Sequence, residues 1–488
     1  MRPMPTACVL SITVPVISAL PVVALLSSTA PSPKPVEPRV RSVPVAGVDE
    51  WALRSDAGRQ SEIAAASSRV QAQNGPENGG ELSRPAIFTT PRKARDFELL
   101  GVTWRASADA DLIVVVRVHG AGGWSGWKVL EVASAPGKAE GALKRRGTEP
   151  LYTGPSGRFQ VRVDVRSGGL PNDVRVSLID PGRSRADAGL GRSGPAATAA
   201  AATTRPRIFT RAEWGADERL RGSPPKYSST VKAGFVHHTT GANRYAANDV
   251  PRILRSIYAY HTKSSGWSDL GYNFLVDRFG RTWEGRHGGI TRAVIGAHTG
   301  GFNTDTFGVA AIGDYSNVRA PSPTVEAIGR LMAWKLSVHS VDPYGTTTLV
   351  SSGAGTSRYA RGERAAFNVI SAHRDAGNTD CPGALLAQLP TIRSLVSPVV
   401  DLSQVRKAIR TRRTSAAARP DVLVVEKALL RLRYLNKAYA DGRAGPATRA
   451  AYARWQRALG FTGANADGLP GLTSLTRLRA RFGFKVSL

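Results

Sequence analysis

The residues with the clearest chemistry are a cysteine and two histidines in the second half of the chain. Cys381 follows His373 by eight residues in HRDAGNTDCPG, and His237 ends the apolar run AGFVH. A catalytic zinc site needs three protein ligands and leaves one position open for water. A thiolate and two imidazoles meet that need, and ligation also protects the thiolate from oxidation. The alternative to a metal site is that each of these histidines is a hydrogen-bonded residue of the core.

The cysteine count supports the metal hypothesis if the N-terminal segment, which contains one of the two cysteines, is removed. Residues 1–30 hold one charged residue and the apolar run VLSITVPVISALPVVALL, which is typical of a secretory signal peptide. A membrane anchor is disfavoured because Pro15 and Pro21 interrupt the run, and no second apolar stretch approaches the roughly 20 residues of a bilayer span. Cleavage would remove Cys8 and leave Cys381 alone. A lone exported thiol needs burial or a metal.

The net charge narrows the choice of partners. The chain has 66 Lys and Arg against 37 Asp and Glu, a formal net charge of +29. Such an excess suits nucleic acid, anionic lipid or an acidic cell wall, and a general arginine bias that keeps the protein soluble is the alternative. Nucleic acid is disfavoured because the chain is expected to be exported and shows no basic stripe interleaved with aromatic residues. We expect a secreted protein, extracellular or associated with a cell wall, without a permanent membrane anchor.

The mixed pattern of residues 205–397 must position the three candidate ligands. AGFVHHTT and FGVAAIGD are apolar runs typical of buried strands, and GYNFLVDRFGRTWEG predicts a hairpin. TVEAIGRLMAWKLSVH has the spacing of an amphipathic helix. Strands interleaved with helices predict an α/β or α+β domain. His237 and His373 would each end a strand, and Cys381 would lie in a loop.

The rest of the chain divides by composition into further segments, which make the predicted fold multidomain. The runs DLIVVVRVHG and GRFQVRVDV predict β-strands, and the weak repeat ADGRAGPAT and ADGLPGLTS marks turns before helices. We predict a signal peptide over 1–30, a Pro/Ser/Gly-rich tether over 31–84, an all-β sandwich over 85–182, an Ala/Thr linker over 183–204, a basic hinge over 398–419 and a three-helix module over 420–488.

Four separated motifs within 205–397 resemble one family. FVHHTT, the DLGYNFLVDRFG–TWEGR block, IGAHTGGFNTDTFGVAAIGDY and SAHRDAGNTDCPG occur in this order. Together they resemble the zinc amidases of the peptidoglycan recognition protein family, which are related to the phage lysozyme-type amidases. The resemblance implies a central mixed β-sheet flanked by helices, with zinc at the floor of an open groove. It also implies hydrolysis of the amide between N-acetylmuramic acid and L-alanine in peptidoglycan.

The resemblance assigns roles to individual residues. It implies Zn²⁺ ligands at His237, His373 and Cys381, and a catalytic tyrosine at Tyr272 in GYNF. Thr379 lies two residues before the cysteine, where the phage enzymes have lysine and many active recognition proteins have threonine. There we expect a second donor for the oxyanion.

The chain departs from related cytoplasmic recycling amidases at two positions. Those enzymes carry a glutamate in the strand that reads FGVAAIGD here, where Ala310 stands at about the same place. Their third metal ligand is Asp, whereas this chain has Cys381. No glutamate general base is therefore assumed, and the site would depend more on zinc and less on proton shuttling.

Four further residues are candidates for substrate binding, each with a structural alternative. His298 in GAHTGG would line the groove or hold a loop. Glu284 and Arg286 in WEGR would contact substrate or form an ion pair at a strand end. Trp455 in AAYARWQRALG would contact glycan or pack in a core. The segment around Trp455 resembles, more weakly, the three-helix peptidoglycan-binding modules of secreted wall hydrolases.

These observations predict a secreted, zinc-dependent N-acetylmuramoyl-L-alanine amidase. Its expected partners are peptidoglycan and its muropeptides, with anionic wall polymers as further partners, and no nucleic acid. The alternative on the same fold is a non-catalytic peptidoglycan receptor. Family members that lose the thiolate lose catalysis, so the presence of Cys381 and Tyr272 favours the enzyme.

Overall fold

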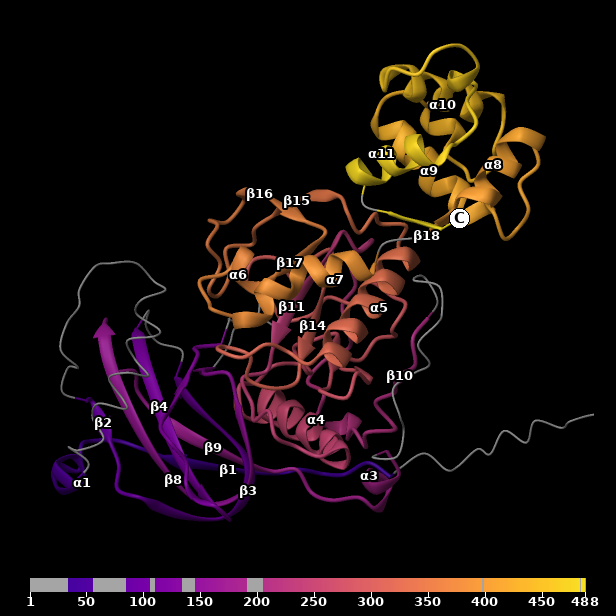
Figure 1. The fold of residues 1–488 in the computed structure, drawn as a ribbon. Coiled ribbons are helices and arrows are strands. Elements are labelled where there is room, and N and C mark those ends of the chain that lie inside the picture. Colours follow the sequence, from indigo (N-terminus) through magenta and orange to yellow (C-terminus); the bar gives the residue numbers. More distant parts are fainter. Residues whose placement is uncertain are drawn as a thin grey trace, which may run out of the picture. The chain divides into compact units, whose positions relative to one another are not determined.

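The computed structural model of the chain has two large sheets, two small two-stranded sheets and helices in its central and C-terminal parts (Figure 1). The structure describes residues 34–55, 85–105, 110–133, 145–190, 205–396, 399–482 and 484–487. The predicted signal peptide, over 1–30, lies outside the described residues. Within the described residues, no helix is both long and apolar enough to cross a bilayer.

The N-terminal segment is all-β, as its strand patterns predict. Its strands are β1 (Arg39–Pro44), β2 (Ile87–Phe88), β3 (Arg92–Arg105), β4 (Asp111–Gly120), β5 (Gly123–Trp124), β6 (Lys128–Leu130), β7 (Arg145–Gly147), β8 (Leu151–Ser167) and β9 (Arg175–Asp180). They join in a nine-stranded sheet whose main path is β1-β9-β3-β8-β4-β5. Apolar side chains such as Val114, Val161 and Val176 form its core. We call this part of the chain the β domain.

The β domain begins before its predicted boundary, and the predicted linker after it contains a helix. β1 lies within the segment whose composition predicts a tether, yet it pairs with β9 along its whole length. The same segment contains α1 (Glu50–Ser55), and α3 (Arg185–Leu190) lies within the predicted linker. Composition misses β1 because a short strand at the edge of a sheet needs little apolar sequence of its own.

The second sheet is mixed, which confirms the fold expected for 205–397. Its strands are β10 (Ile208–Phe209), β11 (Ala233–His238), β12 (Phe274–Val276), β13 (Thr282–Glu284), β14 (Thr306–Ala311) and β17 (Ile370–Ala372), in the order β10-β13-β12-β14-β11-β17. β12 and β13 form the predicted antiparallel hairpin, and the other neighbours pair in parallel. We call this part the central domain.

Helices and short turns surround the second sheet. They are η3 (Glu218–Leu220), η4 (Ala247–Asp249), α4 (Val250–Ala259), the π-helical turn η5 (Tyr260–Ser264), α5 (Ser322–Val338), α6 (His373–Ala376), η6 (Gly383–Gln388) and α7 (Leu389–Leu395), together with the hairpin β15 (Thr346–Val350) and β16 (Arg364–Asn368). Alternate strand residues pack on opposite faces: Phe274 and Val309 face the cluster of α5 and α7, whereas Leu275 and Ala310 face that of α4.

The β domain and the central domain share a core at α4. Leu99 of β3 and Ile179 of β9 belong to the same apolar cluster as Ile257 of α4. Polar contacts reinforce it, since the Tyr260 hydroxyl donates to the Thr148 carbonyl at 2.9 Å. Residues 33–488 form one compact unit, consistent with this shared core.

The C-terminal region is helical, and it begins earlier than predicted. It contains β18 (Val399–Asp401), α8 (Leu402–Thr411), α9 (Arg419–Arg431), η7 (Lys437–Tyr439), α10 (Pro446–Ala458), η8 (Gly463–Ala466), α11 (Leu472–Phe482) and β19 (Lys485–Ser487). The segment 398–419, predicted as a basic hinge, contains α8. Val405 and Ile409 on its buried face pack with Leu429 and Tyr452, so four α-helices share this core. The many basic residues of α8 make the segment look polar in composition, although Val405 and the residues three and four positions after it are apolar and buried.

The contact between Gly101 of β3 and Tyr260 generates a test of the shared core. A Cβ atom at Gly101 would overlap the Tyr260 ring, so we expect Gly101→Ala to lower the free energy of unfolding by about 1–3 kcal/mol, the usual cost of overpacking. Thermal melting measures the effect. The matched control is Gly157→Ala on β8, where an added Cβ meets nothing within 4 Å. Equal melting temperatures for the two variants would contradict this packing.

Candidate metal centre

Parallel strand pairing brings the two predicted histidine ligands together. β11 pairs in parallel with β17, and Val236 lies opposite Ala372. His237 and His373 are the next residues on each chain, so both come to the same edge of the sheet. Their ring centroids lie 4.6 Å apart.

Cys381 reaches the same edge from the loop after α6. Its Sγ accepts a hydrogen bond from the backbone N–H of His238 at 3.4 Å and lies 3.8 Å from Nδ1 of His237. The backbone N–H of Cys381 donates to the Thr379 hydroxyl at 3.1 Å, which fixes the loop. The candidate ligand atoms of His237, His373 and Cys381 all lie within 4.8 Å of one another.

The chemistry of this cluster fits a zinc ion. Two imidazoles and a thiol are a common donor set for Zn²⁺, and all three side chains are buried. Burial lowers the pKa of His237 well below its ordinary value and that of His373 to about 3, so both rings are neutral and able to ligate. Burial raises the pKa of the Cys381 thiol well above its ordinary value. A bound cation would offset that cost and stabilise the thiolate.

His298 and His238 support the cluster in different ways. Nδ1 of His298 lies 3.2 Å from Nε2 of His237, which is the nitrogen that faces away from Cys381. Such a partner fixes the orientation of a ligating ring. His298 is 3% exposed, so the structure places it behind a candidate ligand instead of along an open groove. Nδ1 of His238 accepts from the Tyr315 backbone N–H at 3.0 Å, which gives this residue a structural partner.

Tyr272 and Thr379, the predicted catalytic residues, both lie at this cluster. The ring centroid of Tyr272 lies 5.3 Å from that of His237. The Tyr272 hydroxyl donates to Oε2 of Glu149 at 3.3 Å, and the Thr379 hydroxyl donates to Oε2 of Glu131 at 2.9 Å. Both glutamates belong to the β domain. The sequence gives no signal for them, because they lie in no motif and are more than 100 residues from their partners in the chain.

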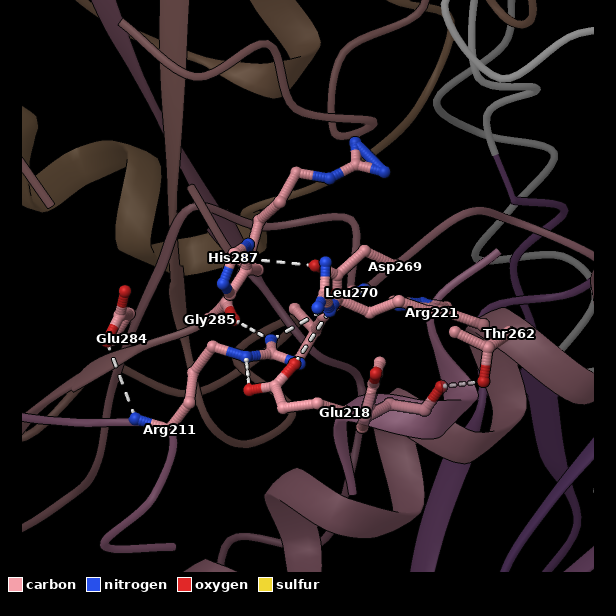
Figure 2. Close-up of polar contacts among 12 residues, drawn as sticks. Arg211, Glu218, Arg221, Thr262, Asp269, Leu270, Glu284, Gly285 and His287 are labelled. Carbon is pink, nitrogen blue, oxygen red and sulfur yellow. Dashed lines mark hydrogen bonds and ion pairs between the residues drawn. The ribbon is translucent and has the colours of Figure 1, made fainter. Parts of the chain in front are cut away.

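Glu284 and Arg286 both have partners within the central domain, and Figure 2 shows Glu284 beside the buried Arg211. The Arg211 side chain donates to Glu218 at 2.8 Å, while its backbone N–H donates to Glu284 at 3.4 Å. Arg286 donates to the Ser268 hydroxyl at 3.0 Å. The structure thus gives both predicted substrate contacts structural partners.

Trp455 lies in the C-terminal core. Its side chain is 1% exposed, and its indole N–H donates to the carbonyl of Ser474 at 3.0 Å. This placement favours the packing role over a glycan contact.

Comparison with known proteins assigns the central domain to a family. Residues 227–384 match the family model described as N-acetylmuramoyl-L-alanine amidase. Peptidoglycan-recognition protein SC2 of Drosophila simulans is 29% identical over 178 residues, which cover 36% of this chain and 80% of that protein. Human N-acetylmuramoyl-L-alanine amidase is 34% identical over 191 residues, 38% of this chain and 28% of that protein. The central domain belongs to the peptidoglycan recognition protein and amidase family.

Two further matches concern the N-terminal part of the chain and the central domain. Residues 60–204 match a model described as Rv3811 N-terminal galactose-binding domain-like. The solved structure of wild-type Drosophila PGRP-LB superposes on this chain with a TM-score of 0.30 and 24% sequence identity. The superposed part covers 38% of this chain and 93% of the PGRP-LB chain. Both family models end before α8. The resemblance of 420–488 to wall-binding modules therefore stays a prediction.

The convergence of the three ligands generates a metal prediction. We expect one zinc per chain, and Cys381→Ser should lose it, because a serine hydroxyl does not ionise to a soft anionic ligand. Elemental analysis of the dialysed protein measures the content. Zinc should also raise the melting temperature of the parent chain and not of the variant, since a ligand at about 100 times its Kd adds roughly 2.7 kcal/mol.

The control for this experiment is Tyr272→Phe, which leaves the three donor atoms in place and should keep its zinc. A Cys381→Ser protein that retains one zinc per chain would show that the thiolate is not a ligand.

Proposed function

We propose that the chain is a secreted, zinc-dependent N-acetylmuramoyl-L-alanine amidase that cleaves the amide between N-acetylmuramic acid and L-alanine in peptidoglycan. The observation that carries the proposal is the buried convergence of His237, His373 and Cys381 within the segment that matches the amidase family. The name of the human relative supports the same reaction.

The residues at the cluster divide the work of amide hydrolysis. His237, His373 and Cys381 would hold the zinc ion, which when bound supplies Lewis-acid polarisation of the carbonyl and activation of a water molecule. Tyr272 lies beside His237, where its hydroxyl can orient the water or stabilise the developing oxyanion. Thr379 fixes the Cys381 loop through its hydroxyl oxygen.

The alternative is a peptidoglycan receptor without catalysis on the same fold. A receptor has no need of a metal, whereas this chain keeps two neutral imidazoles, a thiol and a tyrosine at one point. This complete set favours the enzyme. Burying such groups without a ligand would also be costly.

The direct test is the release of stem peptides from peptidoglycan. The zinc-loaded protein should produce free L-alanine amino groups, and mass spectrometry should identify intact glycan and peptide products. A chelator should abolish the release, and zinc should restore it. Binding of muropeptides without any release would support the receptor instead.

Tyr272 provides a prediction on the catalytic step. Tyr272→Phe removes one hydroxyl and should lower kcat about 100- to 1000-fold, the usual cost of losing one well-placed transition-state contact. Zinc content and muropeptide affinity should stay at the parent values, because neither depends on this hydroxyl. Steady-state kinetics with a soluble muropeptide measures the loss. An unchanged kcat would mean that another group orients the water.

The C-terminal module provides a prediction on wall retention. Because α8 packs in the module core, the truncation should remove everything after residue 398 and not only residues 420–488. Sedimentation with insoluble wall should weaken, since a second binder raises the local substrate concentration, while cleavage of soluble muropeptides should persist.

Charge on α8 needs its own control. Arg406, Lys407 and Arg410 are exposed, and replacing all three by Gln removes their charge without touching the core. Binding through these charges should fade at about 1 M salt, where the screening length is about 3 Å. Equal sedimentation of the truncated and full chains at low and high salt would show that the module is not the anchor.

A further inference from the structure

The central domain contains no glutamate at the position where related recycling amidases carry one. Ala310 lies opposite His237 in the pairing of β14 with β11, and it is buried in the α4 cluster. The structure supplies carboxylates from a different part of the chain. Glu149 accepts from the Tyr272 hydroxyl at 3.3 Å, and Glu131 accepts from the Thr379 hydroxyl at 2.9 Å.

The fold holds these two glutamates as a pair. Glu131 follows β6 and Glu149 follows β7, and the backbone N–H of Glu149 donates to the Glu131 carbonyl at 2.7 Å. The residues beside Glu149 are anchored to the central domain. The Thr148 carbonyl accepts from the Tyr260 hydroxyl, and the Tyr152 carbonyl accepts from the Ala242 N–H at 3.1 Å. Both carboxylates are therefore fixed relative to the candidate metal centre.

The surroundings of the pair are acidic. Burial raises the pKa of each glutamate to about 7, and Asp380 and Glu149 act in the same direction on Glu131. Partly buried acids among acidic neighbours are costly for stability. A divalent cation at the nearby cluster would offset part of that cost, and such costly arrangements are typical of functional sites.

A pocket joins the two domains at the same place. Its volume is about 790 Å³, and its lining includes Leu130 and Glu131 of the β domain and Asn378 and Thr379 of the central domain. A substrate in this pocket would contact both domains. The pocket adjoins the candidate metal centre through Thr379, whose hydroxyl contacts the Cys381 backbone, and the β domain forms one wall of this pocket.

We propose that the β domain completes the amidase active site, with Glu149 as a positioning residue that fixes the Tyr272 hydroxyl and Glu131 as its counterpart on Thr379. The inference rests on the proposed function. A tyrosine hydroxyl has one proton, and Tyr272 donates it to Glu149, so this proton is not available for a hydrogen bond to the substrate. The Tyr272 oxygen keeps its acceptor lone pairs when it donates, and through them it can accept a hydrogen bond from the attacking water and orient it.

The same reasoning defines the role of Thr379. Its hydroxyl accepts from the Cys381 N–H and donates to Glu131, so its proton is already used. Glu131 thus fixes the loop that carries Cys381, and Thr379 is a clamp for that loop instead of an oxyanion donor.

The test uses the full-length, zinc-loaded protein and a soluble muropeptide. Glu149→Ala should lower kcat about 10- to 100-fold, the usual effect of losing a partner that orients an active-site group. KM and zinc content should not change. Glu149→Gln, whose amide oxygen still accepts a hydrogen bond, should recover most of the rate.

The matched control is Glu98→Ala. Glu98 also belongs to the β domain and accepts a hydrogen bond from a tyrosine hydroxyl, but its partner is Tyr152, at 3.1 Å, and not Tyr272. The Glu98→Ala variant should keep the parent rate. An equal loss in Glu98→Ala would assign the effect to domain packing and overturn the proposal.

A double-mutant cycle separates positioning from an independent effect. If Glu149 acts through Tyr272, Glu149→Ala should cause no further loss in a Tyr272→Phe background. The melting temperatures of the metal-free proteins provide a readout without turnover, and there the two losses should be less than additive. Additive losses in both cycles, an unchanged rate in Glu149→Ala, or a faster rate because the carboxylate blocks the site would each overturn the inference.

Failure of the proposed function gives a different result. In that case the parent protein itself releases no stem peptide. The melting cycle on metal-free protein would still report whether Glu149 and Tyr272 are coupled.

Discussion

The parallel pairing of β11 with β17 is the constraint on which the candidate site depends. Because Val236 lies opposite Ala372, the following residues, His237 and His373, emerge together at one edge of the sheet. Val236 itself packs in the core that faces α5. A slip of one residue would turn His237 into that apolar core and Val236 toward the cluster, so the core and the candidate metal centre require the same register.

Burial then determines what the cluster can bind. Desolvation keeps both imidazoles neutral and opposes ionisation of the Cys381 thiol, so the three side chains by themselves carry little charge. The carboxylates of Glu131 and Glu149 provide negative charge at its border. Ligands of low charge and an acidic border together suit a divalent ion, which would stabilise the thiolate and both carboxylates at once.

Packing at α4 connects this electrostatic arrangement to the rest of the fold. The helix covers one face of the central sheet, and its other neighbours are residues of β3 and β9. The β domain is therefore docked through an apolar core, which resists the displacement that a flexible tether would permit. A rigid interface of this kind is what allows Glu149 to hold a side chain of another domain in a defined direction.

The sequence by itself determined the central domain and the identity of its chemical groups. The alternating and apolar patterns around FVHH, GYNF and FGVAAIGD predicted the strands, and a lone cysteine beside two strand-end histidines predicted a metal centre. The strand signals are local, because each depends on residue types within about ten positions. The metal prediction instead combined the cysteine count of the whole chain with the resemblance of four separated motifs to one family. Only the tertiary structure decided that Glu131 and Glu149 contact the predicted catalytic residues, that His298 lies behind a candidate ligand, and that α8 joins the C-terminal core. Contacts between residues more than 100 positions apart leave no periodicity in the chain, because they depend on how completed sheets and helices pack against one another.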